Sequence, residues 1–377
     1  MKIVIAPDSF KESLTALEVA HAIEAGFKQV FPDAKYVKIP MADGGEGTVQ
    51  ALVDATKGNI VRTSVKGPLH AQVDSFYGIL GDGETAVIEM AAASGLHLID
   101  ESEKDAKLTC SYGTGQLIND ALDKGIRKFV IGLGGSATND GGAGMLTALG
   151  AVLTDSNGKQ IPAGGIHLHR LNHIDQTNIH PQLSRATFLV ACDVSNPLCG
   201  DYGASAVFGS QKGASKTDIA ELDKNLLHFG QKLEAVSKKT IVNFSGSGAA
   251  GGMGASLLAI CNAQLQSGIE LVTSTLDLAD KVKNADLVIT GEGRIDGQSV
   301  FGKTPVGVAK VAKQHDCAVI AISGSVTDDY DVVFQHGIDA VFPIISEPCS
   351  LSEALAKGAI NIKRTAFNIA NTLKLNN

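Results

Sequence analysis

The sequence contains no tryptophan, and only 5% of its residues are aromatic. No stretch reaches the ~18 consecutive apolar residues of a membrane helix, so an integral membrane protein is not indicated. The apolar start of the chain meets Pro7 and Asp8 too soon to be the core of a signal peptide. We therefore expect a cytoplasmic protein that has no membrane partner.

Other absences narrow the class further. The six cysteines include no C-x-x-C pair, so neither a zinc site nor a disulfide framework is indicated. The formal net charge of −8 lacks the basic excess of nucleic-acid binders, so no nucleic-acid partner is expected. The first apolar run is not followed by G-x-G-x-x-G, which argues against a nicotinamide-dependent oxidoreductase. The class that these absences leave is an ordinary globular protein, which agrees with the 44% of hydrophobic residues.

The chain is long enough for two domains, because 377 residues exceed the ~100–200 residues of a typical single domain. Short apolar runs alternate with helical patterns near both ends of the chain, which predicts a parallel sheet with right-handed crossovers. The expected strands are 2–6, 34–39, 60–65, 287–290, 318–323 and 338–343, and the later helices are 305–315 and 351–373.

The middle of the chain follows another pattern. Residues 73–80 and 85–90 flank Gly81-Asp82-Gly83, which predicts an antiparallel hairpin. We therefore predict an α/β protein with a parallel-sheet, Rossmann-like domain formed by both chain ends and an inserted mixed α/β domain. The expected domains are 1–66 plus 284–377 and 67–283, with the active site in the cleft between them.

Glycine is the residue in excess, with 42 in the chain, and many of these glycines lie in a few clusters. The apolar run 128–133 leads directly into a loop that contains Gly134, Gly135, Ser136 and Thr138. Backbone amides of such a loop form a nest for an oxyanion, hydroxyls add donors, and a following helix start adds a positive dipole. We predict that these four residues bind the phosphates of ATP, although a tight turn would need the same glycines.

A second cluster, 245–254, includes Gly251 and Gly252 and opens onto another helical pattern. A second contact with ATP suits this composition, and so does close packing of two helices. Residues 297–304 also match the letters of a P-loop, but six residues separate them from the preceding strand and Pro305 follows. We expect no P-loop fold here, while Lys303 is predicted to contact a phosphate.

The third cluster, 290–297, mixes one cation with two carboxylates. An arginine fork suits bidentate recognition of an acid group, so Arg294 is predicted to hold the substrate, with Glu292 beside it. A structural ion pair of Arg294 with Glu292 or Asp296 is the alternative.

Carboxylates also follow the other expected strands. Asp193 ends the buried run 188–192, where it would suit a general base for an attacking hydroxyl, or else form a turn before Pro197. Because the carboxyl ends of parallel strands meet at one edge, Asp8–Lys11 and Asp43–Glu46 should be neighbours. The substrate-binding prediction covers Asp8 and Ser9, and the catalytic prediction adds Lys11 to Asp193.

Magnesium is expected with the nucleotide. Its predicted ligands are Asp43, Glu46 and Asp296, since carboxylate oxygens suit this hard cation. Capping of the helix that begins near Thr48 is the alternative for Asp43 and Glu46.

Five blocks of the sequence, taken together, resemble the bacterial type 1 glycerate kinase family, which is glycerate 2-kinase-like. The blocks are 6–14, 41–48, 132–142, 246–254 and 290–296, so the resemblance covers essentially the whole chain. It implies ATP-dependent phosphorylation of D-glycerate, with Mg²⁺ as the metal and 2-phosphoglycerate as the favoured product.

Other functions remain open at this point. The alternatives are a kinase of another short hydroxy acid or sugar acid, and a non-catalytic sensor of a sugar acid. The sequence leaves the oligomeric state open.

Overall fold

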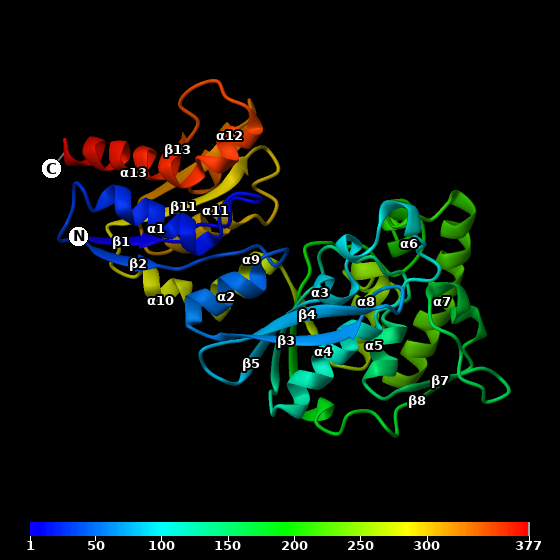
Figure 1. Cartoon of the computed structure of the whole chain (residues 1–377). Helices are drawn as coiled ribbons and strands as arrows, with labels where there is room; N and C mark the ends of the chain where they lie inside the picture. Colours follow the sequence, from blue (N-terminus) through cyan, green and yellow to red (C-terminus); the bar gives the residue numbers. More distant parts are fainter. Residues whose placement is uncertain (376–377) are drawn as a thin grey trace. The chain divides into compact units, whose positions relative to one another are not determined.

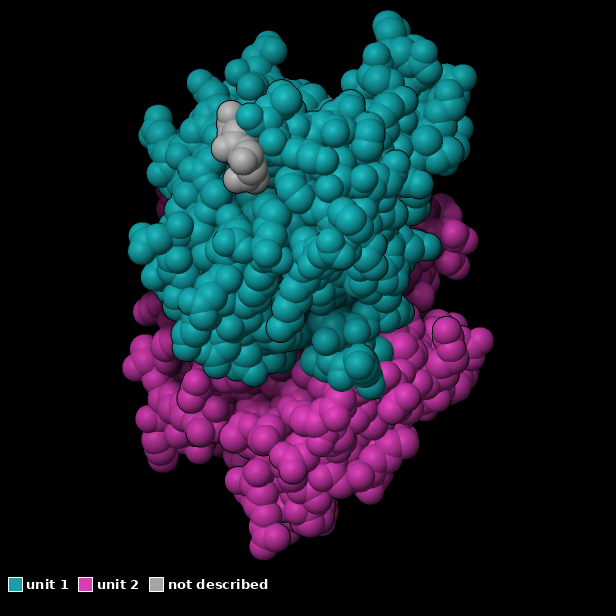
Figure 2. Space-filling model, turned by 90° about the vertical axis from the view of Figure 1, so that its left-hand side faces the viewer, with its two compact units in different colours: residues 1–43, 50–57, 267–377 teal, residues 44–49, 58–266 magenta. Residues whose placement is uncertain are grey.

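The structure is a computed structural model of the chain, and it describes residues 1–375. The chain forms two compact units, which Figure 2 shows in different colours. Unit 1 comprises residues 1–43, 50–57 and 267–377, and unit 2 comprises residues 44–49 and 58–266. No helix within residues 1–375 is both long enough and apolar enough to cross a membrane.

Unit 1 is built on a five-stranded sheet in which every pair is parallel, in the order β13-β12-β11-β1-β2. Its strands are β1 (Lys2–Ile5), β2 (Lys35–Lys38), β11 (Leu287–Ile295), β12 (Val319–Val326) and β13 (Ala340–Pro343). The chain winds outward in one direction from β1 and in the other from β11. The gap between the ends of β1 and β11 is therefore the topological switch point, where doubly wound sheets bind ligands.

Two helices from opposite ends of the chain cover one face of this sheet, α1 (Ala16–Phe27) and α13 (Gly358–Lys374). They lie side by side in Figure 1. Gly26 permits this approach, because a Cβ there would lie 2.5 Å from the carbonyl oxygen of Lys363. The sheet therefore joins the two chain ends into one unit, as predicted.

Besides α1 and α13, unit 1 contains α9 (Gly268–Thr275), α10 (Leu278–Val282), α11 (Thr304–Lys313) and α12 (Leu351–Ala356). Helix α11 contacts the strands β11 and β12, and it also contacts two of the remaining helices of unit 1, α9 and α10. Helix α2 (Thr48–Thr56) begins in unit 2 and continues in unit 1. The single helix expected over 351–373 is instead two helices, α12 and α13, which meet at Lys357.

Unit 2 contains a six-stranded mixed sheet in the order β10-β9-β6-β5-β4-β3. Its strands are β3 (Asn59–Lys66), β4 (Gln72–Ile79), β5 (Thr85–Glu89), β6 (Lys128–Gly132), β9 (Thr187–Ala191) and β10 (Gln264–Gln266). The pairs from β5 to β10 are parallel, and β4 and β5 form the antiparallel hairpin predicted around Gly81-Asp82-Gly83. The loops after β5, β6 and β9 therefore meet at one edge of the sheet.

The expectation that residues 60–65 extend the first parallel sheet is wrong. Strand β3 pairs antiparallel with β4 along its whole length, from Asn59 opposite Ile79 to Lys66 opposite Gln72. A short connection can join antiparallel neighbours, whereas a parallel neighbour would need a long crossover. Only residues 67–71 separate the two strands, so β3 belongs to unit 2.

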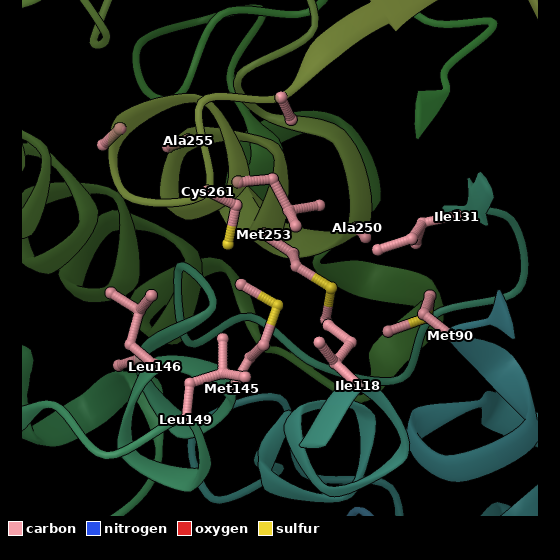
Figure 3. Close-up of a cluster of buried hydrophobic side chains, with 14 of the residues drawn as sticks. Met90, Ile118, Ile131, Met145, Leu146, Leu149, Ala250, Met253, Ala255 and Cys261 are labelled. Atoms are coloured by element: carbon pink, nitrogen blue, oxygen red, sulfur yellow. The ribbon is translucent and has the colours of Figure 1, made fainter. Parts of the chain in front are cut away.

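Helices pack into one apolar core with the unit 2 sheet. Figure 3 shows Ile118, Met145 and Met253 close together within it. The helices are α3 (Ala91–Ser94), α4 (Tyr112–Asp123), α5 (Ala143–Ala148), α6 (Ala204–Phe208), α7 (Lys216–Ser237) and α8 (Ala249–Ala259), and a small ribbon adds β7 (Val152–Thr154) and β8 (His173–Asp175). This core anchors both ends of the glycine-rich loops.

Candidate active site

The switch point of unit 1 carries an acidic cluster. Asp8 lies three residues beyond β1, and its backbone N–H donates to the carbonyl of Gly291 in β11 over 2.8 Å. Glu292 is the next residue of β11, and the charge of Asp43, which follows β2, acts on both carboxylates. The prediction that Asp8 and Asp43 are neighbours is therefore confirmed, and three adjacent strands supply the cluster.

Asp8 is held by donors from both ends of the chain. Its Oδ1 accepts from the backbone N–H of Ser9 over 2.6 Å, and its Oδ2 accepts from the hydroxyl of Thr304 over 2.5 Å. Burial and then the charge of Asp43 raise the pKa of Asp8 to about 6, although these hydrogen bonds oppose the rise. Asp8 can therefore take up or release a proton near neutral pH.

Glu292 is buried, with 9% of its surface exposed, and accepts a hydrogen bond from Ser299 over 2.8 Å. Burial raises its pKa to about 7, and the charges of Asp8 and Asp43 add to the rise, against the Ser299 hydrogen bond and the charge of Lys303. A carboxyl group with such a pKa can donate or accept a hydrogen bond to a hydroxyl of a substrate. Perturbed groups of this kind gather at functional sites.

Cations lie beside this cluster. Lys303 Nζ is 3.2 Å from Asp296 Oδ1, and Arg294 Nε is 3.6 Å from Asp296 Oδ2. The structural ion pair that was the alternative for Arg294 is thus present, yet the Arg294 side chain is 64% exposed and open to a ligand. Lys11 is also exposed, in the turn that follows Ser9.

The letters of a P-loop at 297–304 do not form one. Residues 297–302 make turns, helix α11 begins only at Thr304, and the Thr304 hydroxyl is bound to Asp8. The expectation of no P-loop fold is therefore confirmed. Sequence analysis did not identify Ser299 and Thr304, whose roles depend on carboxylates far along the chain.

The three predicted magnesium ligands lie on different segments of the chain, and their joint role as ligands stays a prediction. Asp296 is paired with Lys303 and Arg294, and Glu46 belongs to unit 2 while Asp43 belongs to unit 1. No group of three or more acidic, histidine or cysteine side chains suited to a metal is found within residues 1–375. The Asp8 and Asp43 carboxylates do fit Mg²⁺, since a cation would relieve the repulsion that raises the pKa of Asp8.

Glu89 binds the start of helix α2. The carboxylate of Glu89, at the end of β5, accepts from the backbone N–H of Val49 over 2.8 Å and also from Gly47 and Thr48. Burial raises the pKa of Glu89, and these hydrogen bonds oppose the rise. Glu46 is left exposed in the preceding loop.

Unit 2 carries the predicted phosphate loop. Gly134 and Gly135 are exposed, Gly135 has a φ of +74°, and Ser136 is 8% exposed. The carbonyl of Gly135 accepts from Leu96, but the N–H groups of Gly134, Gly135 and Ser136 have no backbone acceptor among residues 1–375. Three such donors in a turn suit an oxyanion.

The predicted contribution of a helix start to this loop is wrong. Helix α5 begins only at Ala143, and the carboxylate of Asp140 occupies its N-terminus. Asp140 accepts from the N–H groups of Gly142 and Gly144 over 3.0 and 3.1 Å and from the Ser111 hydroxyl over 2.8 Å. The dipole of α5 thus stabilises the carboxylate of Asp140, and the N-terminus of this helix is not available to a ligand.

Lys212 is the residue that sequence analysis missed in unit 2. Only 2% of its surface is exposed, and Nζ donates to Ser136 Oγ over 2.8 Å and to the carbonyl of Thr138 over 2.7 Å. Burial lowers its pKa to about 7, against the charge of Asp140. No periodicity marks Lys212, which lies 76 residues from Ser136.

Gly251 and Gly252 are buried, and both have positive φ. A Cβ on Gly251 would lie 1.9 Å from the carbonyl oxygen of Thr138, and the N–H of Gly141 donates to the Gly251 carbonyl over 3.0 Å. Close packing is therefore present, but Gly251 packs against the loop 138–141 and not against a second helix as the alternative had it. These glycines support the phosphate loop from behind.

Asp193 lies two residues after β9, exposed at the same sheet edge as the loop that follows β6. Neighbouring Cys192 is partly buried, and burial raises the pKa of its thiol, so Cys192 is no activated nucleophile. The carboxylate of Asp193 therefore remains the candidate general base at this sheet edge.

An acidic switch point and a glycine-rich oxyanion loop define the class of an α/β phosphotransferase that acts on small hydroxy compounds. Residues 3–374 match the profile of the Glycerate kinase family. The chain is 58% identical over 373 residues to a glycerate kinase from Haemophilus influenzae, with 99% of each chain covered. It is 54% identical over 375 residues to a glycerate 2-kinase from Escherichia coli, with 100% of this chain and 98% of the relative covered.

A crystal structure of a protein assigned as glycerate kinase 2, from Salmonella typhimurium LT2, has the same fold. The TM-score is 0.93 at 53% identity, over 100% of this chain and 99% of the other. The chain belongs to the glycerate kinase family. It is accordingly a phosphotransferase with an alcohol group as acceptor and ATP as phosphate donor.

Proposed function

We propose that the chain transfers the γ-phosphoryl group of ATP to the 2-hydroxyl group of D-glycerate. The observation that carries this proposal is the acidic cluster at the switch point of unit 1, where Asp8 and Glu292 have pKa values of about 6 and 7. Groups of this kind accept hydrogen bonds from hydroxyls. The name of the Escherichia coli relative supports the 2-hydroxyl as the acceptor.

The acid group of glycerate needs cations. Arg294 is exposed beside Asp296, and Lys11 is exposed in the turn after Ser9. We assign the carboxylate of glycerate to these two side chains, because an arginine fork binds a carboxylate through two hydrogen bonds. Asp8, Ser9 and Glu292 then bind its hydroxyl groups.

The phosphates of ATP are assigned to the loop of Gly134, Gly135 and Ser136, whose N–H groups are free to donate. Lys303 is assigned to a phosphate oxygen, since it carries a positive charge next to the acidic cluster. Gly251 and Gly252 hold the loop in shape. The oxygens of ATP and the carboxylates of Asp8 and Asp43 would hold Mg²⁺, which neutralises charge on the phosphates.

The transfer forms a bond between the glycerate oxygen and the γ-phosphorus and breaks the bond from that phosphorus to the β–γ bridging oxygen. ADP leaves with that oxygen. The proton of the attacking hydroxyl goes to Asp193, which we propose as the general base. The other residues position and neutralise the reacting groups, which is most of what phosphoryl transfer requires.

A coupled assay of ADP release tests the proposal. We expect turnover with ATP, Mg²⁺ and D-glycerate, and phosphorus NMR of the product should identify 2-phosphoglycerate. Other short hydroxy acids and sugar acids should be poorer acceptors. Turnover with one of them and none with glycerate would contradict the substrate assignment.

A further inference from the structure

Lys212 is buried next to the phosphate loop. Burial of a charged lysine costs free energy unless the charge is paired or hydrogen-bonded. This lysine lies in a short 3-10 turn, Ser210–Lys212, between α6 and α7. Two of its N–H groups bind Ser136 Oγ and the carbonyl of Thr138, and no further acceptor for Nζ is found within residues 1–375. The charge therefore lies next to Ser136 and Thr138, in the same loop as the N–H groups of residues 134–136.

The direction of the hydrogen bond to Ser136 matters. A charged lysine can only donate, so Ser136 Oγ must accept, and no acceptor for its own hydroxyl hydrogen is found within residues 1–375. That hydrogen remains available for an oxygen of a ligand. A neutral lysine could instead accept from Ser136, and the donor would then be lost to the ligand.

Polar atoms next to Lys212 also lack partners. Thr138 Oγ1 and Asn139 Oδ1 are fully buried and have no hydrogen-bond partner within residues 1–375, although Asn139 Nδ2 donates to Ser205 Oγ in α6 over 2.8 Å. Unsatisfied buried polar atoms are rare in native proteins and often mark functional sites. Segment 204–212 therefore supports a loop whose polar groups are only partly satisfied by the protein itself.

We propose that Lys212 is a positioning residue, which sets Ser136 and the backbone of residues 134–138 to bind the phosphates of ATP. The proposal rests on the assignment of this loop to ATP in the proposed function. Lys212 acts through Ser136 and through its charge, and it does not touch the nucleotide.

Lys212→Met keeps the length of the side chain and removes the charge and both hydrogen bonds. Binding of ATP, measured by calorimetry, should weaken about 10-fold or more, since hydrogen bonds to charged groups are the strong ones. The KM for glycerate should change less than about twofold. Lys216→Met, at an exposed lysine in the first turn of α7, is the matched control and should bind ATP as the wild type does.

The pH dependence separates this role from a merely structural one. The pKa of Lys212 is about 7, and Asp140 is the charged group that acts on it. ATP affinity of the wild type should therefore fall as pH rises from 6 to 8.5, while Lys212→Met should lack this slope. If Lys212→Met does not fold, Ser136→Ala should show a smaller slope than the wild type, because the contribution through Ser136 is lost while the charge of Lys212 remains.

Two results would overturn the proposal: an ATP affinity of Lys212→Met within about twofold of wild type, or a slope with pH that Lys212→Met retains or that Ser136→Ala leaves unchanged. Gly134→Val tests the underlying assignment separately, because a Cβ there would meet only Gly45, at 3.5 Å. If Gly134→Val binds ATP normally, the phosphate loop itself is wrongly assigned. If Gly134→Val weakens ATP binding and Lys212→Met does not, the assignment of the loop to ATP is supported and the role of Lys212 is refuted.

Discussion

The hydroxyl of Thr304 donates to Asp8 Oδ2 over 2.5 Å, although 296 residues separate the two along the chain. This hydrogen bond links the start of α11 to the loop that follows β1, and it opposes the rise in the pKa of Asp8. Burial alone would make the ionised carboxylate of Asp8 costly. Thr304 therefore stabilises the charged form of Asp8, together with the hydrogen bonds from Ser9.

Thr304→Val should destabilise the protein most where Asp8 is ionised. The free energy of unfolding at pH 8 should fall by about 1–3 kcal/mol, the usual range for a hydrogen bond to a charged group. At pH 5, where Asp8 is largely protonated, the loss should be smaller. Urea denaturation at both pH values measures this, with Thr304→Ser as a control that keeps the hydroxyl. An equal loss at both pH values would show that packing dominates.

Glu292→Gln should increase stability at alkaline pH. The pKa of Glu292 is about 7 in the folded protein against 4.5 for the exposed group, so folding favours its protonated form. Stability from this group is complete below pH 4.5 and is lost as pH rises through 7. Glutamine does not titrate, so at pH 8 the variant should be more stable than wild type by about 1–3 kcal/mol.

The activity of Glu292→Gln should instead fall below that of the wild type, since stability and function often conflict at such sites. Glu270→Gln is the matched control, because Glu270 is 62% exposed and forms a surface ion pair with Lys310. Its stability should track that of the wild type at every pH. If the stability of Glu292→Gln relative to wild type does not increase between pH 4.5 and 8, then ionisation of Glu292 does not destabilise the folded protein.

Sequence analysis predicted that Asp8 and Asp43 are neighbours, because each follows an apolar run and parallel strands align their carboxyl ends. It assigned Glu292 to the substrate site beside Arg294, without placing it next to the other two carboxylates. It could not find Lys212, Ser299 or Thr304. Their partners depend on how distant segments pack, and no local pattern marks them. It also misplaced strand β3, since a short apolar run has the same composition in either sheet.

The glycine clusters show the same limit. A cluster that binds a ligand and a cluster that packs against another segment have the same composition. Burial separates them here, because Gly134 and Gly135 are exposed while Gly251 and Gly252 are enclosed by residues 138–141 and Leu198.

Removal of Mg²⁺ with a chelator should abolish turnover, and added Mg²⁺ should restore it. Asp43→Asn should raise the Mg²⁺ concentration needed for half-maximal rate about 10-fold or more, because an amide is a weaker ligand than a carboxylate. Asp296→Asn should change this requirement less, since Asp296 is already paired with Lys303 and Arg294. Equal shifts in both variants would favour the three-ligand site predicted from the sequence.

Asp193→Asn tests the general base. The amide is nearly isosteric with the carboxylate but cannot accept the proton of the attacking hydroxyl. Loss of a general base alone lowers the catalytic rate by typically ~10²–10⁴-fold, so kcat should fall by about that factor while KM for ATP and glycerate changes little. Steady-state kinetics with both substrates measures this split.

The matched control is Asp201→Asn, at another exposed aspartate of the segment that follows β9. Its kcat should equal that of the wild type. A raised Mg²⁺ requirement in Asp193→Asn would instead make Asp193 a metal ligand, because loss of a base leaves that requirement unchanged. If kcat and the Mg²⁺ requirement both stay within about threefold of wild type, a barrier change under ~1 kcal/mol, then Asp193 only forms the turn before Pro197. The base would then have to be sought among the carboxylates of unit 1, where the raised pKa of Asp8 makes it the first to replace.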